Sequence, residues 1–402
     1  MIWYLEFFCH LLFGICYLKY NLVYYFCRQN LVKTIMRNLR ITLSFLLLPL
    51  SILYGTIIYL RNKFYDWGIF SSRSFNIPIL AVGNITVGGT GKTPHVEYLA
   101  ELLRDEFNPA TLSRGYKRKS KGFRLVETSD SPRQVGDEPS QIKRKYPELT
   151  VAVDANRVRG IENIRQQKPE VDLILLDDAF QHRKVQANLS ILLIDYNHPI
   201  TKDFMLPLGN LREPAFEKSR ANIIIITKAP ADMQPIQRRI FLDRLKPYPY
   251  QGVFFTTLAY EKIKPVFPDA LKKEETNQPD RNTKVLLVTG IANPAPMKKY
   301  VEENISKQIY SVKFADHKNF TSSDIEKIRR RFERLEGEKI ILTTEKDAIR
   351  FGETEAIPAE MKQAFFYLPV RVKFLNDRTN DFNRQIIDYV RKNKKHSFLY
   401  PG

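Results

Sequence analysis

The sequence predicts an α/β protein with two domains, each built around a largely parallel sheet. Short runs that are apolar throughout alternate with helix-like patterns from Ile77 to Ala229, and a second series of the same kind begins at Lys284. Such runs are typical of strands that helices cover on both faces. The 402 residues, of which 44% are hydrophobic and 27% charged, are sufficient for two globular cores.

The predicted elements follow one another in a regular order. The apolar runs of the first series lie at 77–82, 110–113, 150–153, 171–176, 190–194 and 221–227. Those of the second series lie at 284–289, 308–314 and 340–344, with helices at 322–336 and near 380–392. A proline-containing linker with an expected strand pair around 251–259 separates the two series. The predicted segments are therefore 1–35, 36–76, 77–230, 231–283 and 284–402.

An uncharged stretch, ITLSFLLLPLSILYGTIIYL at 41–60, precedes the first series. At about 1.5 Å per residue it would just span about 30 Å of hydrocarbon. Basic residues flank both of its ends, so the distribution of charge does not predict which end would face the cytoplasm. Pro49 would kink a spanning helix, which leaves embedding at the membrane interface as an alternative. We expect 36–76 to form a membrane-associated helix and connector; a buried core helix is the competing interpretation.

Residues 1–35 form a second apolar segment, interrupted by Glu6 and His10. They are either an extra membrane segment or an over-extended start, because the segment beginning at Met36 would itself serve as a start. The three cysteines of the chain are Cys9, Cys16 and Cys27. Residues 28–402 therefore hold neither a disulfide nor a thiolate metal site, as expected of a protein body that faces the cytosol.

A glycine-rich stretch, TVGGTGKT at 86–93, follows an apolar run and opens a helical pattern. Such a turn directs backbone N–H groups and a helix N-terminus at phosphate oxygens. Lys92 is expected to reach the β and γ phosphates of a nucleotide, and the Thr93 hydroxyl to bind Mg²⁺. Thr86 stands where the strict formula has glycine, but every phosphate-binding group is present. The predicted nucleotide contacts are Thr86, Gly88, Gly89, Thr90, Gly91, Lys92 and Thr93.

Two acidic residues, Asp177 and Asp178, end the run VDLILLDD. Open α/β sheets bind ligands at the carboxyl ends of their strands. Adjacent carboxylates are costly there unless a cation neutralises them. We therefore predict a role beside Mg²⁺, with simple helix capping as the alternative. His182 follows shortly after and is a candidate for the same edge of the sheet.

Several further segments are weaker candidates for a site. Arg114 and Tyr116 directly follow the second predicted strand, at the edge where the phosphate loop lies. The sequence GDEP at 136–139 is a rigid acidic turn, and the stiff loop LPLGNLREP at 206–214 offers Arg212 and Glu213. In the second series, ADH at 315–317 and TTEKD at 343–347 each follow a strand.

Taken together, these blocks resemble the tetraacyldisaccharide 4′-kinases of lipid A biosynthesis. The matching sequences are LLLPLSILYG, VGNITVGGTGKTP, SRGY, GDEP, LLDDAFQH, LPLGNLREP, ADHKNF and TEKDAIR. They occur in the order of that family from about residue 36 to 368, and Thr86 belongs to the family's own version of the loop. Residues 1–35 lie outside the resemblance, and Ala179-Phe180 replaces the Gly-Leu of many relatives.

The resemblance implies transfer of the ATP γ-phosphate, with Mg²⁺, to the 4′-hydroxyl of a tetraacyl glucosamine disaccharide 1-phosphate, forming lipid IVA. It implies two α/β/α sandwich domains, a P-loop kinase core and a smaller C-terminal domain, joined by a two-stranded β linker. The expected place is the cytoplasmic face of the inner membrane of a Gram-negative bacterium. A lipid substrate and an anionic leaflet would account for the net charge of +19. A monomer that binds no nucleic acid is expected.

The resemblance also implies roles for single residues. Asp137 resembles the family's catalytic acid, paired with His317, and Glu138 a ligand of Mg²⁺. A sugar hydroxyl is a poor nucleophile, so a carboxylate that a histidine orients could act as its base or position it. Asp177, Asp178 and His182 would form a second acidic edge near the metal. Arg212 and Glu213 would touch the substrate or close the cleft. From their positions at the same edge of the sheet, Arg114, Tyr116 and His182 are further candidates for contact with the substrate. Whether Asp137 or Asp178 accepts the proton is open.

A membrane-associated P-loop switch ATPase that acts on a protein partner is the alternative. It would explain the phosphate loop and the apolar lead, but not the ADH and LREP blocks. Val87 also stands where many such dimeric switches carry a second lysine. A nucleic-acid-binding ATPase would use the basic charge (the pI is near 9.6), but the sequence shows no aromatic-basic binding motif.

Overall fold

The computed structural model describes residues 30–270, 279–291, 293–316, 318, 320–354 and 356–399, with side chains described from residue 47 to 393. The chain divides into two compact units. Of the described residues, unit 1 contains 30–92, 173–257 and 374–399, and unit 2 contains 93–172 and 258–373. Of the segment 1–35, expected to be an extra apolar segment or an over-extended start, residues 1–29 lie outside the described part.

Unit 1 is built on parallel strands in the spatial order β8-β7-β6-β1-β5. Their bounds are β1 Ile79–Gly83, β5 Leu173–Asp177, β6 Leu189–Asp195, β7 Ile223–Thr227 and β8 Gly252–Tyr260. The first four are buried along almost their whole length, because their residues are nearly all Ile, Leu, Val or Ala. The order places β1, which leads into the phosphate loop, between β5 and β6.

The helices of unit 1 are α2 (Asn30–Asp66), α7 (Pro235–Leu245) and α12 (Thr379–Leu399), with short 3₁₀ turns η1 (Ile200–Lys202) and η2 (Ala215–Arg220). Helix α12 packs on β8 through Phe382, whose ring lies 5.1 Å from that of Phe254. It is the helix predicted near 380–392, which the sequence placed in the last segment, 284–402. Its described ring contacts are made with unit 1.

Helix α2 buries one face against unit 1 from residue 47 onward. Leu47, Tyr54, Ile58 and Asn62, spaced by four or seven residues, are each at most 9% exposed. The Tyr54 hydroxyl donates to the carbonyl of Arg212 at 3.0 Å, which ties the helix to the loop at 206–214. The helix continues through Pro49. Among the residues that the structure describes, no helix has the length and apolar content of a membrane span.

Unit 2 contains two sets of strands. In the first, β2 (Pro109–Ser113) pairs in parallel with β4 (Thr150–Val153), which pairs antiparallel with β3 (Arg124–Leu125). The second is a sheet in the order β11-β10-β12-β13-β9, parallel except for β9. Its bounds are β9 Lys264–Pro265, β10 Lys284–Thr289, β11 Ile309–Lys313, β12 Lys339–Thr344 and β13 Phe365–Leu368.

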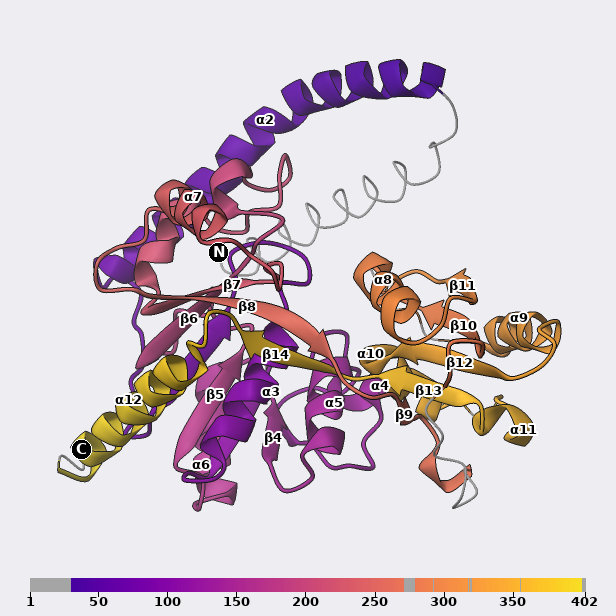
Figure 1. The fold of residues 1–402 in the computed structure, drawn as a ribbon. Helices are drawn as coiled ribbons and strands as arrows, with labels where there is room; N and C mark the ends of the chain where they lie inside the picture. Colours follow the sequence, from indigo (N-terminus) through magenta and orange to yellow (C-terminus); the bar gives the residue numbers. More distant parts are fainter. Residues whose placement is uncertain are drawn as a thin grey trace. The chain divides into compact units, whose positions relative to one another are not determined.

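The helices of unit 2 cover these strands (Figure 1). They are α3 (Lys92–Leu103, Lys92 itself belonging to unit 1), α4 (Pro132–Val135), α5 (Asp137–Lys145), α6 (Arg157–Gln167), α8 (Ala295–Asn304), α9 (Ser322–Glu333), α10 (Glu345–Gly352) and α11 (Ala359–Lys362), with the turn η3 (Pro268–Ala270). The α/β class and the predicted strands of both series are confirmed. The sequence missed β13 and β14 (Val370–Phe374), which Pro369 separates.

Candidate functional site

The loop between β1 and α3 has the backbone of an anion-binding turn. Gly88 and Gly91 have φ values of 105° and 84°, which side chains other than glycine rarely adopt. Such positive φ values let backbone N–H groups turn toward a bound anion, as in the glycine-rich loops that hold phosphates. Helix α3 begins directly after, at Lys92, so its N-terminal N–H groups add to the same positive end.

Lys92 is held behind this loop by two acceptors. Its Nζ lies 3.4 Å from Asp178 Oδ1 and 3.4 Å from Asn84 Oδ1. Arg212 Nη1 lies 3.5 Å from the other oxygen of Asp178. Burial acts to raise the pKa of Asp178, but the charges of Lys92 and Arg212 outweigh it and hold the pKa below its usual value. Asp178 is therefore an ionised carboxylate between two cations.

Arg212 reaches Asp178 because the loop at 206–214 runs along the phosphate loop. The Val87 N–H donates to the carbonyl of Asn210 at 2.8 Å, and the Arg212 N–H to that of Ile85 at 2.8 Å. The next residue, Glu213, is 1% exposed and binds Arg220 and Asn62. Burial, as the largest cause, raises the pKa of Glu213. Because Asn62 belongs to α2 and Arg220 to η2, Glu213 joins these two elements within unit 1.

Polar atoms at this site point to a ligand rich in oxygen atoms. Thr90 Oγ1 and Arg212 Nε are buried and have no hydrogen-bond partner among the described residues. Both can donate to phosphate oxygens. The Asp177 carboxylate, 5% exposed at the end of β5, is a hard oxygen donor of the kind that Mg²⁺ uses beside phosphate oxygens. Thr93, the next residue after Lys92 in α3, is the first residue of unit 2. No group of three or more His, Cys, Asp or Glu within the described ranges is arranged to hold a metal ion alone.

The structure adds residues to this site that the sequence analysis missed. Lys228, which follows β7, donates through Nζ to the carbonyl of Gly89 in the phosphate loop and lies 2.8 Å from Asp195 Oδ2. Gln181 Nε2 donates to the carbonyl of Asn84 at 2.6 Å. The signal that could have identified Lys228 is its position: it follows a strand at the same carboxyl edge as Asp177.

In unit 2, α5 begins with the acidic pair of the GDEP turn. Asp137 follows Gly136, whose φ of 102° allows the sharp entry into the helix. Arg350 of α10 binds both oxygens of Asp137, with a distance of 3.3 Å between Nε and Oδ1. Lys346 Nζ of the same helix lies 3.9 Å from Glu138 Oε1. The TEKD segment, a weak candidate from sequence, thus contacts the GDEP segment.

The remaining predicted residues lie as follows. Arg114 and Tyr116 of unit 2 are exposed directly after β2, Tyr116 being 56% exposed. His182 of unit 1 is half-buried, and its N–H donates to the carbonyl of Ala179 at 2.9 Å. His317 lies outside the described residues, so its expected pairing with Asp137 stays a prediction.

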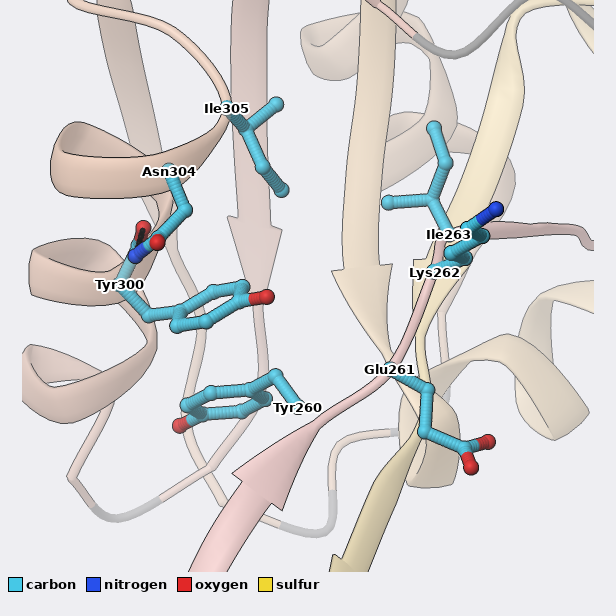
Figure 2. Close-up of a pocket in the computed structure, with 7 residues that line it drawn as sticks. All are labelled: Tyr260, Glu261, Lys262, Ile263, Tyr300, Asn304 and Ile305. Atoms are coloured by element: carbon cyan, nitrogen blue, oxygen red, sulfur yellow. Dashed lines mark hydrogen bonds between the residues drawn. The ribbon is translucent and has the colours of Figure 1, made fainter. Parts of the chain in front are cut away.

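A separate pocket of about 440 Å³ opens in unit 2 (Figure 2). The rings of Tyr260 and Tyr300 face each other there, with centroids 4.6 Å apart. Burial, as the largest cause, raises the pKa of Tyr260 to about 12. None of the predicted site residues lines this pocket.

Known proteins resemble this chain over most of its length. The family model for tetraacyldisaccharide-1-P 4′-kinase matches residues 43–391. The tetraacyldisaccharide 4′-kinase of Phocaeicola vulgatus is 46% identical over 356 residues, which cover 87% of this chain and 96% of the relative. That of Flavobacterium johnsoniae is 40% identical over 353 residues, covering 87% of this chain and 97% of the relative.

A solved structure gives the same result. The crystal structure of "apo" form LpxK from Aquifex aeolicus in complex with ATP has a TM-score of 0.66 and 29% sequence identity, and the match covers 88% of this chain and 99% of that one. This chain therefore belongs to the tetraacyldisaccharide-1-P 4′-kinase family.

Proposed function

We propose that this protein is a kinase that transfers the γ-phosphate of ATP to the 4′-hydroxyl of a tetraacyl glucosamine disaccharide 1-phosphate, forming lipid IVA. One observation carries the proposal: Lys92 behind the glycine-rich loop is bound to Asp178, which is also bound to Arg212. Two cations around one carboxylate at the carboxyl edge of a parallel sheet suit the charge of a transferring phosphoryl group. Family membership supplies the acceptor.

The phosphate loop takes the nucleotide in this proposal. The backbone of Thr86, Gly88, Gly89, Thr90 and Gly91 cradles the phosphates, and Lys92 neutralises charge on the β and γ groups. Thr93, Asp177 and Glu138 would supply oxygen ligands to Mg²⁺. When bound, Mg²⁺ would offset negative charge on the phosphates and help to align the transferred group.

A carboxylate in this proposal accepts the proton of the attacking hydroxyl. We assign this role to Asp137, with His317 as its partner, and assign to Asp178 the placement of Lys92 and Arg212. The carboxylate of Asp178 is bound to both Lys92 and Arg212 beside the phosphate loop, which supports this placing role. Arg114, Tyr116, His182, Arg212 and Glu213 are kept as candidates for contact with the substrate, although Glu213 is 1% exposed.

The apolar face of α2 supports an association with the membrane that holds the lipid acceptor. The large apolar side chains exposed on this helix are Leu48, Ile52, Leu53, Tyr59 and Leu60, between 41% and 61% exposed. They lie on the opposite side from the buried Tyr54 and Ile58, so the helix is apolar on both faces. We propose that this face inserts into the cytoplasmic leaflet of the inner membrane of a Gram-negative bacterium, and that anionic lipids attract the basic chain.

The test is phosphate transfer to lipid. Purified protein in detergent is incubated with radiolabelled ATP, Mg²⁺ and tetraacyldisaccharide 1-phosphate, and the products are separated by thin-layer chromatography. Label that appears in the lipid supports the proposal. ATP hydrolysis with no labelled lipid would refute it and favour a switch ATPase that acts on a protein partner. Lys92→Ala serves as the negative control for both activities.

A further inference from the structure

The guanidinium of Arg350 lies between two carboxylates in unit 2. Its side chain is 4% exposed, and it binds Asp137 through Nε at 3.3 Å and through Nη2. On its other side, Nη1 lies 3.4 Å from Asp347 Oδ1. Both oxygens of Asp137 are therefore engaged by one planar, always charged group.

The second carboxylate is fixed by its own partners. Asp347 is fully buried, and its Oδ2 accepts the N–H of Gly290 at 2.8 Å and the hydroxyl of Thr344 at 2.8 Å. Gly290 directly follows β10, and Thr344 ends β12, so Asp347 is tied to two neighbouring strands of one sheet. Arg350 is thus held by the sheet through Asp347 and holds Asp137 with its opposite edge.

We propose that Arg350 is a positioning residue that orients the carboxylate of Asp137 for the phosphoryl transfer. The inference rests on the proposed function, in which Asp137 accepts the proton of the sugar hydroxyl. An aspartate side chain has two rotatable bonds, and a carboxylate that must meet one hydroxyl has to be held in a single orientation. The two-point contact with Arg350 fixes the plane of that carboxylate. Arg350 itself touches neither reactant in this proposal.

The competing explanation is that Arg350 only joins α5 to α10. The chain offers a matched control for it, because Arg144 of α5 joins the same two helices. Arg144 Nη2 lies 3.3 Å from Glu353 Oε1, and Nη1 lies 3.5 Å from the carbonyl of Ile349. Arg144→Met removes an arginine contact between these helices without touching Asp137.

The experiment compares Arg350→Met, Arg350→Lys and Arg144→Met in the full-length protein with the acceptor lipid and Mg-ATP. We expect Arg350→Met to lower kcat about 100-fold with KM for ATP nearly unchanged, the effect of a misplaced catalytic group. Arg350→Lys keeps the charge without the planar fork and should recover part of kcat, which keeps the test valid if Arg350→Met folds poorly. Arg144→Met should keep kcat within about twofold, as for an ion pair near the surface.

A double-mutant cycle separates the two explanations. If Arg350 acts through Asp137, Asp137→Asn combined with Arg350→Lys should be no slower than Asp137→Asn alone. Two outcomes would overturn the inference and leave the proposed function intact. In the first, the double variant is slower than Asp137→Asn by the same factor by which Arg350→Lys slows the wild type. In the second, Arg350→Lys keeps the wild-type kcat and Arg350→Met is folded and fully active. A normal rate for Asp137→Asn, or no labelled lipid from the unaltered protein, would overturn the proposed function and this inference with it.

Discussion

The ammonium of Lys92 lies 3.4 Å from the carboxylate of Asp178, although Lys92 follows β1 and Asp178 follows β5, far apart in the sequence. The strands pair in parallel, so the loop after β1 and the turn after β5 meet at one edge of the sheet. Asp178 has a φ of 48°, a left-handed conformation that costs a non-glycine residue about 1 kcal/mol or more. The turn thus holds an energetically unfavourable conformation that brings its carboxylate to the lysine.

Lys92→Ala should abolish most of the transfer while the fold survives. The ammonium is expected to neutralise developing phosphate charge, so its loss should lower kcat by about 100- to 1000-fold. The lipid-labelling assay gives the rate, and circular dichroism checks the fold. Lys246→Ala is the control, because Lys246 belongs to the same unit and is exposed at the end of α7. An active Lys92→Ala variant would contradict the assignment of the loop.

Lys228→Ala should weaken ATP binding more than it slows the chemical step. In a trans peptide the carbonyl of one residue and the N–H of the next point in opposite directions. By binding the carbonyl of Gly89, Lys228 fixes that peptide plane and directs the N–H of Thr90 away from itself. We expect KM for ATP to rise about tenfold with kcat within about threefold of the wild-type value.

The backbone of Lys228 calls for a second variant. Its φ of 55° is left-handed, so Lys228→Gly removes the ammonium and relieves the strain, whereas Lys228→Ala keeps the strain. Both variants should show the same rise in KM, measured by steady-state kinetics over a range of ATP concentrations. A normal KM in Lys228→Gly would show that the effect in Lys228→Ala comes from the backbone.

The contrast between Lys92 and Lys228 shows what the sequence can predict at this site. Lys92 stands in a local motif whose spacing alone predicts its role. Lys228 binds a carbonyl 139 positions away, and Arg350 binds a carboxylate 213 positions away. Such contacts depend on which strands become neighbours, and the order β7-β6-β1 is not the order of the chain. The strands themselves were predictable because their apolar runs are local.

Glu97 should make the stability of the protein depend on pH. It is 3% exposed on α3, where it accepts from Lys145 at 2.6 Å and from Gln141 at 2.8 Å. Burial chiefly, with the nearby charge of Glu345, raises its pKa from 4.5 to about 7, against the opposing effect of Lys145. The folded state therefore holds this proton more tightly than the unfolded chain. The stabilisation is complete below pH 4.5 and is lost as pH rises through about 7.

Glu97→Gln should remove this dependence. The rise in the pKa of Glu97 from 4.5 to about 7 corresponds to at most about 3 kcal/mol of unfolding free energy between these two pH values. Urea unfolding measured across that range should give a flatter profile for Glu97→Gln than for the wild type. Glu162→Gln, on the exposed side of α6, should keep the wild-type profile. An unchanged slope in Glu97→Gln would assign the dependence to another group.

Two isoleucines of α2 should separate folding from membrane binding. Ile58 is 7% exposed and packs with Tyr54 and Leu206, whereas Ile52 is 61% exposed on the same helix. Ile58→Ala should lower the unfolding free energy by about 2–4 kcal/mol, because it leaves a cavity. Ile52→Ala should change it by less than about 0.5 kcal/mol, as at other exposed sites.

For binding to vesicles that contain anionic lipid, we expect the larger effect from Ile52→Ala and the smaller one from Ile58→Ala. If the exposed face inserts, Ile52→Ala loses buried apolar area and should bind about tenfold more weakly. Ile58→Ala, assayed well below its unfolding temperature, should bind within about twofold of the wild-type affinity, because Ile58 faces the protein. Vesicle co-sedimentation measures both. Equal binding by the two variants and the wild type would show that residue 52 stays in water, and that the face of α2 which carries it is not the one that meets the membrane.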